Sequence, residues 1–310
     1  MSQGDRKIVD LEAALYNASV EEVRKCGPGL RVLRIRPDAG PVAYTPGQYI
    51  GLGLGIWAPR ADGRRAEEIP AGQERELMVR HYSFSHPILD PAGGGLVKPG
   101  ALDTCEFYIA LPAYDPGDRE PRFTPRLFAL QDGDRLFIES EAAGEYTADT
   151  VAPDDDVVLV ATGTGEAPHN ALVWHLMARG HRGRIASVVC TRFAAEQGYR
   201  ETHRVLERLR PGYRYLTLTT REPGDGGGRG HLQDYLSSGD LERDLGWKLK
   251  PGRAQVFLCG NPAMIGIPKR RPGIRKYPIP RGMIEVLEGM GFNADDRSGR
   301  PVNIHYERFW

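Results

Sequence analysis

The residue types that most directly suggest chemistry lie in the turn Gly163-Thr164-Gly165. This turn follows an apolar run at residues 157–161 and precedes residues 168–177, whose apolar side chains have helical spacing. A short apolar run bounded by polar residues is typical of a strand buried on both faces of a parallel sheet. A strand, a glycine turn and a helix in this order place backbone N–H groups at a helix N-terminus, where an anion can bind. The pattern therefore predicts a phosphate-binding turn, with a glycine-rich turn that binds nothing as the alternative.

Two arginines at predicted strand ends indicate which nucleotide this turn would bind. The apolar run at residues 185–190 ends in Thr191-Arg192, and the run at residues 213–219 is followed by Thr220-Arg221. An acidic residue at the end of the first run would bind a ribose 2′-hydroxyl, whereas an arginine suits a 2′-phosphate. We therefore expect NADP(H), bound through Arg192 and Arg221, with ordinary solvated arginines as the alternative.

Two kinds of sheet are needed to position these residues. In the second half of the chain, apolar runs alternate with helical patterns, which is typical of a parallel sheet; the runs are residues 157–161, 185–190, 213–219 and 254–259. In the first half, short alternating runs separated by turn signals indicate a small antiparallel barrel; the runs are residues 19–25, 30–36, 49–54, 80–86, 104–111 and 135–140. The expected fold class is a two-domain chain, with an antiparallel β-barrel followed by an α/β parallel-sheet domain.

The overall composition excludes several classes of protein. The chain has 310 residues with zero formal net charge, 40% hydrophobic and 26% charged, which is typical of a globular protein and gives no field that would attract nucleic acid. No apolar run approaches the ~20 residues of a membrane span, and residues 1–10 lack a signal-peptide core. The four cysteines contain no Cys-x-x-Cys pair, so no metal site or iron–sulfur cluster is expected. Free thiols suit a reducing cytoplasm.

A series of motifs resembles the ferredoxin/flavodoxin–NADP(H) reductase family, bacterial type. The central motif, Arg80-His81-Tyr82-Ser83, resembles the family's Arg-x-Tyr-Ser flavin motif. The others, in chain order around it, are Tyr44-Thr45-Pro46-Gly47-Gln48-Tyr49, Glu106-Phe107-Tyr108, Glu139-Ser140-Glu141-Ala142-Ala143-Gly144, Cys259-Gly260-Asn261-Pro262 and an aromatic C-terminus. Each motif alone is weak, but their common order is specific, and the resemblance extends over nearly the whole chain.

The resemblance implies how the two domains divide the function. It implies an FAD-binding β-barrel domain at residues 15–152 and an NADP(H)-binding α/β domain at residues 153–310, whose C-terminal tail returns to the flavin. The predicted boundary lies near Pro153, in an Asp- and Pro-rich linker. We expect a cytoplasmic monomer that binds no nucleic acid.

Four residues of the first half are expected to bind FAD. Arg80 suits the pyrophosphate, because a guanidinium can bind it through two hydrogen bonds. By resemblance, Tyr82 stacks on the flavin ring and Ser83 approaches the reactive flavin nitrogen. The segment ending in Thr124 matches the family's pyrophosphate-binding helix, and we expect Thr124 to cap a helix that continues with Pro125.

The resemblance also assigns catalytic and tail residues in the second half. Ser83, Cys259 and Glu307 form the implied catalytic set, although a buried, purely structural cysteine is the alternative for Cys259. Phe309 matches the family's aromatic residue that covers the second face of the flavin, and Trp310 matches an extra terminal residue of bacterial members. A tail that merely packs on the core is the alternative.

Two further residues are expected at the nucleotide. Tyr199 is predicted to stack on the adenine. A third arginine of the family aligns with His231 in this chain, and Arg229 is predicted to serve in its place.

The predicted function is FAD-dependent exchange of electrons between NADPH and ferredoxin or flavodoxin. No cluster is encoded in the chain, so the one-electron partner is expected to be a separate, acidic protein. Residues 266–281 contain several lysines and arginines and no acidic residue, which predicts a docking patch, with a solvated loop as the alternative. The alternative functions are an NAD(P)H-dependent reductase component of an oxygenase and a flavin- or nucleotide-binding regulatory protein without turnover.

Overall fold

The structure, a computed structural model, describes residues 3–27, 29–61, 67–69, 71–90, 94–111, 121–222, 230–271 and 274–309. Its contacts divide the chain into two compact units. The first unit comprises Met1–His86 and Lys98–Glu145, and the second comprises Pro87–Val97 and Tyr146–Trp310. The cofactor-binding domains expected at residues 15–152 and 153–310 remain a prediction.

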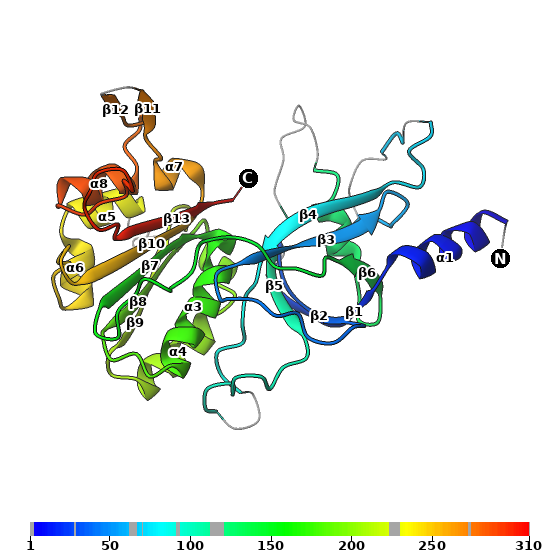
Figure 1. The fold of residues 1–310 in the computed structure, drawn as a ribbon, viewed down its shortest axis with the longest axis horizontal. Helices are drawn as coiled ribbons and strands as arrows, with labels where there is room; N and C mark the ends of the chain where they lie inside the picture. Colours follow the sequence, from blue (N-terminus) through cyan, green and yellow to red (C-terminus); the bar gives the residue numbers. More distant parts are fainter. Residues whose placement is uncertain are drawn as a thin grey trace. The chain divides into compact units, whose positions relative to one another are not determined.

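The first unit is built on a six-stranded antiparallel sheet in the order β4-β3-β6-β1-β2-β5 (Figure 1). Inward positions alternate along a strand, and Leu33 and Ile35 of β2 accordingly enter the core. An isolated bridge between Ser85 and Glu106 joins the chain just after β4 to β5, so the two ends of the sheet approach each other as in a barrel. The elements are α1 (Gln3–Leu15), β1 (Ala18–Gly27), β2 (Leu30–Pro37), β3 (Tyr49–Gly55), β4 (Leu77–Ser83), β5 (Cys105–Ala110), α2 (Thr124–Ala129) and β6 (Arg135–Ile138).

The fourth strand differs from its prediction at residues 80–86, because β4 starts earlier and ends at Ser83. Beyond Ser83 one more hydrogen bond keeps the register of the ladder with β3, and the chain then turns to β5. The N–H of Phe84 donates to the Gln48 carbonyl at 3.0 Å, and the N–H of Ser85 donates to the Glu106 carbonyl at 2.8 Å. The end of β4 is therefore set by the chain crossing to β5.

The second unit is built on a five-stranded parallel sheet in the order β13-β10-β7-β8-β9. Together the two sheets confirm the predicted fold class. The strands are β7 (Asp156–Thr162), β8 (Ile185–Thr191), β9 (Tyr213–Thr219), β10 (Ala254–Gly260) and β13 (Ile304–Arg308). The helices are η1 (Gly163–Gly165), α3 (Glu166–Ala178), η2 (Ala194–Glu196), α4 (Arg200–Leu209), α5 (Leu232–Ser237), α6 (Asp240–Leu245), α7 (Pro262–Ile265) and α8 (Met283–Gly289).

Helices cover both faces of the parallel sheet. Along β7, Val158 and Val160 belong to one apolar cluster, together with residues of α5, α6 and α8. Val157 and Leu159 belong to the other cluster, together with residues of α3. Figure 1 shows these two groups of helices on opposite sides of the strands. Burial on both faces explains why these strands appear in the sequence as continuous apolar runs.

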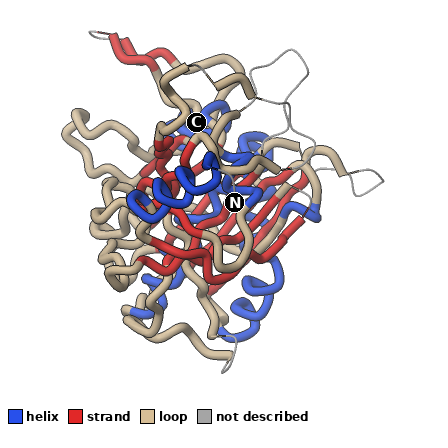
Figure 2. Tube along the Cα trace, turned by 90° about the vertical axis from the view of Figure 1, so that its right-hand side faces the viewer, coloured by secondary structure: helices blue, strands red, loops and turns tan. Residues whose placement is uncertain are grey.

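A small hairpin and a terminal strand complete the second unit. The hairpin pairs β11 (Lys269–Arg271) with β12 (Ile274–Lys276), and it projects from the rest of the unit in Figures 1 and 2. Strand β13 pairs in parallel with β10 at the edge of the sheet. No helix in the described part of the chain is long and apolar enough to cross a bilayer.

Candidate functional site

The predicted phosphate-binding turn lies at the carboxyl end of β7 and packs against the end of β10. Residues Gly163–Gly165 form the short helix η1, and α3 begins at Glu166. A Cβ atom on Gly165 would lie 2.3 Å from the Cys259 carbonyl oxygen, so only glycine permits this backbone contact. Gly260 has a φ of +122° and the same constraint, since its Cβ would lie 2.3 Å from Oγ1 of Thr162. The turn and the end of β10 therefore form one continuous edge.

Cys259 and Glu307 are neighbours at this edge, because the register of β10 and β13 pairs them directly. The Cys259 side chain is fully buried, and burial, followed by the nearby Glu307 carboxylate, raises the pKa of the thiol well above its usual value. Burial also raises the pKa of Glu307 from 4.5 to about 7. A carboxyl group with this pKa can hold or release a proton near neutral pH.

Arg192 and Arg221 follow the carboxyl ends of β8 and β9, where open α/β sheets bind ligands. Their backbones are joined, since the N–H of Arg221 donates to the Arg192 carbonyl at 2.9 Å. The Arg192 guanidinium binds Oε1 of Glu196 through Nη2 at 2.6 Å and Nε at 3.0 Å. Glu196 had no predicted role, although its spacing of four residues from Arg192 is typical of an ion pair. The assignment of both arginines to a 2′-phosphate remains a prediction.

Buried polar side chains tie the start of α3 to neighbouring elements. Glu166, the first residue of α3, accepts a hydrogen bond from the Tyr215 hydroxyl at 2.8 Å, and its Oε1 lies 3.3 Å from Nε2 of His203. The Tyr213 hydroxyl lies 2.7 Å from Nδ1 of that histidine. All four side chains are buried. These contacts hold the helix that follows the turn, and nothing in the sequence distinguishes a buried Glu166 from a solvated one.

The remaining predicted nucleotide and tail residues are placed as follows. Tyr199 is only 2% exposed, so its ring has little free surface, and stacking on an adenine remains a prediction. Phe309 is half-buried against the apolar cluster that contains Phe257, and its contact with a flavin also remains a prediction. Arg229 and Trp310 lie outside the described residues.

In the first unit, the structure brings together two of the predicted FAD residues. The Tyr82 hydroxyl lies 3.4 Å from Oγ1 of Thr124, and burial raises the pKa of Tyr82 to about 12. Ser83, at the end of β4, is buried, whereas Arg80 is exposed and donates to the carbonyl of Val79 at 2.7 Å. The exposed guanidinium, the aromatic ring and the hydroxyls suit a flavin bearing a pyrophosphate.

The predicted helix cap at Thr124 is wrong. Helix α2 begins at Thr124 itself, and the capping position is occupied by Phe123, whose backbone is already helical. The Thr124 hydroxyl is directed instead to Tyr82. Nearby, Arg126 is 3% exposed and pairs with Glu67 at 2.8 Å.

Two further motifs of the first unit converge on β3. Gln48 donates from Nε2 to the carbonyl of Gly144 at 3.2 Å. Oε2 of Glu139 accepts from the N–H of Gly51 at 2.9 Å. The segments around residues 44–49 and 139–144, which are far apart in the sequence, therefore lie side by side.

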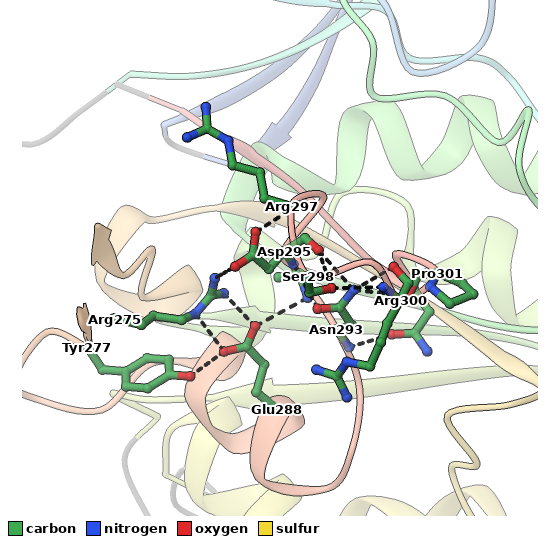
Figure 3. Close-up of polar contacts among 11 residues, drawn as sticks. Arg275, Tyr277, Glu288, Asn293, Asp295, Arg297, Ser298, Arg300 and Pro301 are labelled. Carbon is green, nitrogen blue, oxygen red and sulfur yellow. Dashed lines mark hydrogen bonds and ion pairs between the residues drawn. The ribbon is translucent and has the colours of Figure 1, made fainter. Parts of the chain in front are cut away.

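The basic segment at residues 266–281 is anchored by one of its own arginines. Arg275 donates from Nε to Glu288 at 3.0 Å and pairs with Asp295 at 3.1 Å (Figure 3). The Tyr277 hydroxyl also donates to Glu288. The Asn293 side chain, in turn, donates to backbone carbonyls of the adjoining loop. Arg275 is thus an anchor, and Lys269 and Lys276 are exposed.

One known protein family matches the part of the chain that contains the turn. The family described as "Oxidoreductase NAD-binding domain" matches residues 159–269, which include η1, Arg192 and Cys259. The fold and this edge of the sheet define a two-unit oxidoreductase, with an antiparallel barrel followed by a nucleotide-binding type of α/β unit.

Individual relatives have more specific names. The chain is 28% identical to the flavodoxin/ferredoxin–NADP reductase of Escherichia coli over 223 residues, covering 72% of this chain and 76% of the relative. It is 26% identical to the ferredoxin–NADP reductase of Pseudomonas aeruginosa over 304 residues, covering 95% and 97%. A crystal structure of a ferredoxin NADP+ reductase from Neisseria gonorrhoeae with bound FAD and NADP matches with a TM-score of 0.68 at 20% identity, covering 94% and 97%. The chain is therefore similar to the bacterial ferredoxin/flavodoxin–NADP(H) reductases over most of its length.

Proposed function

We propose that this protein is an FAD-dependent oxidoreductase that exchanges electrons between NADPH and ferredoxin or flavodoxin. The observation that carries the proposal is the edge of the parallel sheet, where the glycine turn, Arg192 and Arg221 lie at the ends of β7, β8 and β9. The backbone N–H groups of the turn suit a pyrophosphate, and the two arginines suit a 2′-phosphate. The relatives from Escherichia coli and Pseudomonas aeruginosa carry the names of this activity.

The residues proposed to bind FAD are those of the first unit. Tyr82 supplies a ring face, Ser83 a hydroxyl, and Arg80 and Thr124 bind the pyrophosphate. When bound, FAD accepts two electrons as a hydride and releases them one at a time. The FAD contacts of Phe309 and Trp310 belong to the same proposal.

The chain's own residues are proposed to position the reacting groups and to supply a carboxyl group that can bind a proton. Gly165 and Gly260 allow the backbone of the turn and of β10 to approach closely, which fixes the two strand ends against each other. The buried thiol of Cys259 lines the strand end. The carboxyl oxygen of Glu307 holds a proton below about pH 7. Hydride transfer depends mainly on such positioning and on excluding water.

An acidic carrier is the proposed one-electron partner. Lys269 and Lys276 are exposed on the hairpin that Arg275 anchors. Two lysines on a fixed hairpin would attract an acidic protein and accelerate its association.

The experiment that tests this function is NADPH-driven reduction of ferredoxin, followed at the absorbance of the carrier. We expect turnover that depends on NADPH, on added FAD-loaded protein and on the carrier. NADPH oxidation without any transfer to ferredoxin or flavodoxin would favour the second candidate, a reductase component of an oxygenase. That candidate is favoured by the Glu196 carboxylate at Arg192, since a carboxylate at this edge suits the ribose hydroxyl of NADH.

A further inference from the structure

Glu196 uses both of its carboxylate oxygens at the end of β8. Oε2 accepts hydrogen bonds from the backbone N–H of Arg192 at 3.0 Å and of Phe193 at 3.4 Å. Oε1 accepts both hydrogen bonds of the Arg192 guanidinium. The Glu196 side chain is 19% exposed and that of Arg192 is 46% exposed. The carboxylate is therefore fixed between the backbone of the turn and the guanidinium.

A second carboxylate lies at the same edge. Oε2 of Glu222 accepts from the N–H of Ala194 at 2.8 Å, and Glu222 directly follows Arg221 in the sequence. Among the described residues of these two strand ends, two carboxylates therefore accompany the two arginines. A 2′-phosphate that binds Arg192 approaches a carboxylate already hydrogen-bonded to that guanidinium, and like charges at this distance repel. A ribose 2′-hydroxyl meets no such repulsion and can donate a hydrogen bond to a carboxylate.

We propose that Glu196 determines nucleotide specificity by competing with the 2′-phosphate of NADP(H) for Arg192. The carboxylate weakens the preference for NADPH over NADH without contributing to hydride transfer. This inference rests on the proposed function, since it assumes that Arg192 faces the nucleotide's 2′-position.

Substitution of Glu196 by glutamine separates charge from structure. The glutamine oxygen can still accept the backbone hydrogen bonds of the turn, so the turn is retained, while the negative charge that competes for Arg192 is lost. Glu201→Gln is the matched control. Glu201 pairs with Arg204 on α4 at 3.1 Å and is 82% exposed, so this variant removes the same charge from an exposed ion pair of the same unit that does not include Arg192.

The experiment measures the ratio of kcat/KM for NADPH to that for NADH, and the affinity for 2′-phospho-AMP and AMP by calorimetry. Glu196→Gln should raise the NADPH-to-NADH ratio about three- to tenfold and strengthen the binding of 2′-phospho-AMP by a similar factor, since one partly buried charge, shared with Arg192, is removed. The affinity for AMP should not change, and the increase should shrink at high ionic strength. Glu201→Gln should leave all these quantities unchanged.

Three outcomes would overturn the inference. These are an unchanged ratio in Glu196→Gln, an equal change in Glu201→Gln, and equal losses for both nucleotides, which would show that Glu196 only supports the turn. Arg192→Ala separates this failure from that of the proposed function. If Arg192→Ala weakens the binding of 2′-phospho-AMP while Glu196→Gln has no effect, only the proposed role of Glu196 is wrong. If Arg192→Ala has no effect either, the assignment of Arg192 to the 2′-phosphate is wrong.

Discussion

The hydroxyl of Tyr82 lies 3.4 Å from Oγ1 of Thr124, although the two residues are far apart in the sequence. Tyr82 is near the end of β4, and Thr124 is the first residue of α2. The contact joins the proposed stacking platform for the flavin to the proposed pyrophosphate-binding segment. The two parts of the proposed FAD site in the first unit are therefore expected to act together.

A double-mutant cycle tests this coupling. We expect Thr124→Val and Tyr82→Phe each to weaken FAD binding about three- to tenfold, because each removes one hydroxyl. The double variant should lose less than the sum of the two, because the hydroxyls contact each other. FAD release, followed by flavin fluorescence during dialysis, gives the three values. Strictly additive losses would show that the two hydroxyls act independently.

The two arginines at the strand ends should discriminate between nucleotides. Arg192→Ala and Arg221→Ala are expected to raise the KM for NADPH about tenfold or more, because each removes a charge-assisted contact to the 2′-phosphate. The KM for NADH should scarcely change. Steady-state kinetics with both nucleotides provide the measurement, and equal losses for NADPH and NADH would argue against the 2′-phosphate assignment.

The contact between the turn and β10 makes Gly165 sensitive to a single methyl group. Gly165→Ala places a Cβ atom 2.3 Å from the Cys259 carbonyl oxygen, and a strained repacking of this kind typically costs about 1–3 kcal/mol. Urea denaturation should show this loss, together with weaker nucleotide binding. Gly212→Ala is the control, because no atom lies within 4 Å of its added Cβ. A Gly165→Ala variant as stable as the control would contradict the close approach of these two backbones.

Glu307 should make stability depend on pH in a defined window. Its pKa is raised by burial from 4.5 to about 7 in the folded protein, so folding favours the protonated carboxyl. The stabilisation is fully present below about pH 4.5 and is lost as the pH rises through 7. Because Glu307→Gln stays neutral, its free energy of unfolding relative to the wild type should increase between pH 5 and about pH 7 and then level off. Denaturation at several pH values measures this difference, and a flat difference would mean that Glu307 titrates normally.

Much of the fold could be predicted from the sequence, because burial on both faces gives the parallel strands continuous apolar runs, as at residues 157–161. The edge strand β13 could not, since only Ile304 of its residues is buried, and the others are partly or fully exposed and resemble a polar tail. The pair Thr124-Pro125 is typical of a helix cap in composition, whereas the backbone of Phe123 is already helical. The role of Glu196 depends on a turn that brings it back to Arg192, which only the structure shows.

The two hairpin lysines should affect the kinetics with the carrier protein and leave those with the nucleotide unchanged. Lys269→Gln combined with Lys276→Gln is expected to raise the KM for an acidic ferredoxin about tenfold at low salt, because docking loses two attractive charges. The NADPH kinetics should be unchanged, and the difference should disappear at high salt. Lys248→Gln combined with Lys250→Gln is the matched control, because it removes two charges from exposed lysines of the same unit outside the hairpin. An equal effect of the control would assign the change to net charge alone.

The most direct test of the whole account is the flavin itself. The purified protein, loaded with FAD and mixed anaerobically with NADPH in a stopped-flow spectrometer, should show a flavin absorbance band that bleaches at a rate saturating with NADPH. A protein that remains colourless after reconstitution with FAD, or whose bound FAD is not reduced by NADPH or NADH, would contradict the account at its central claim.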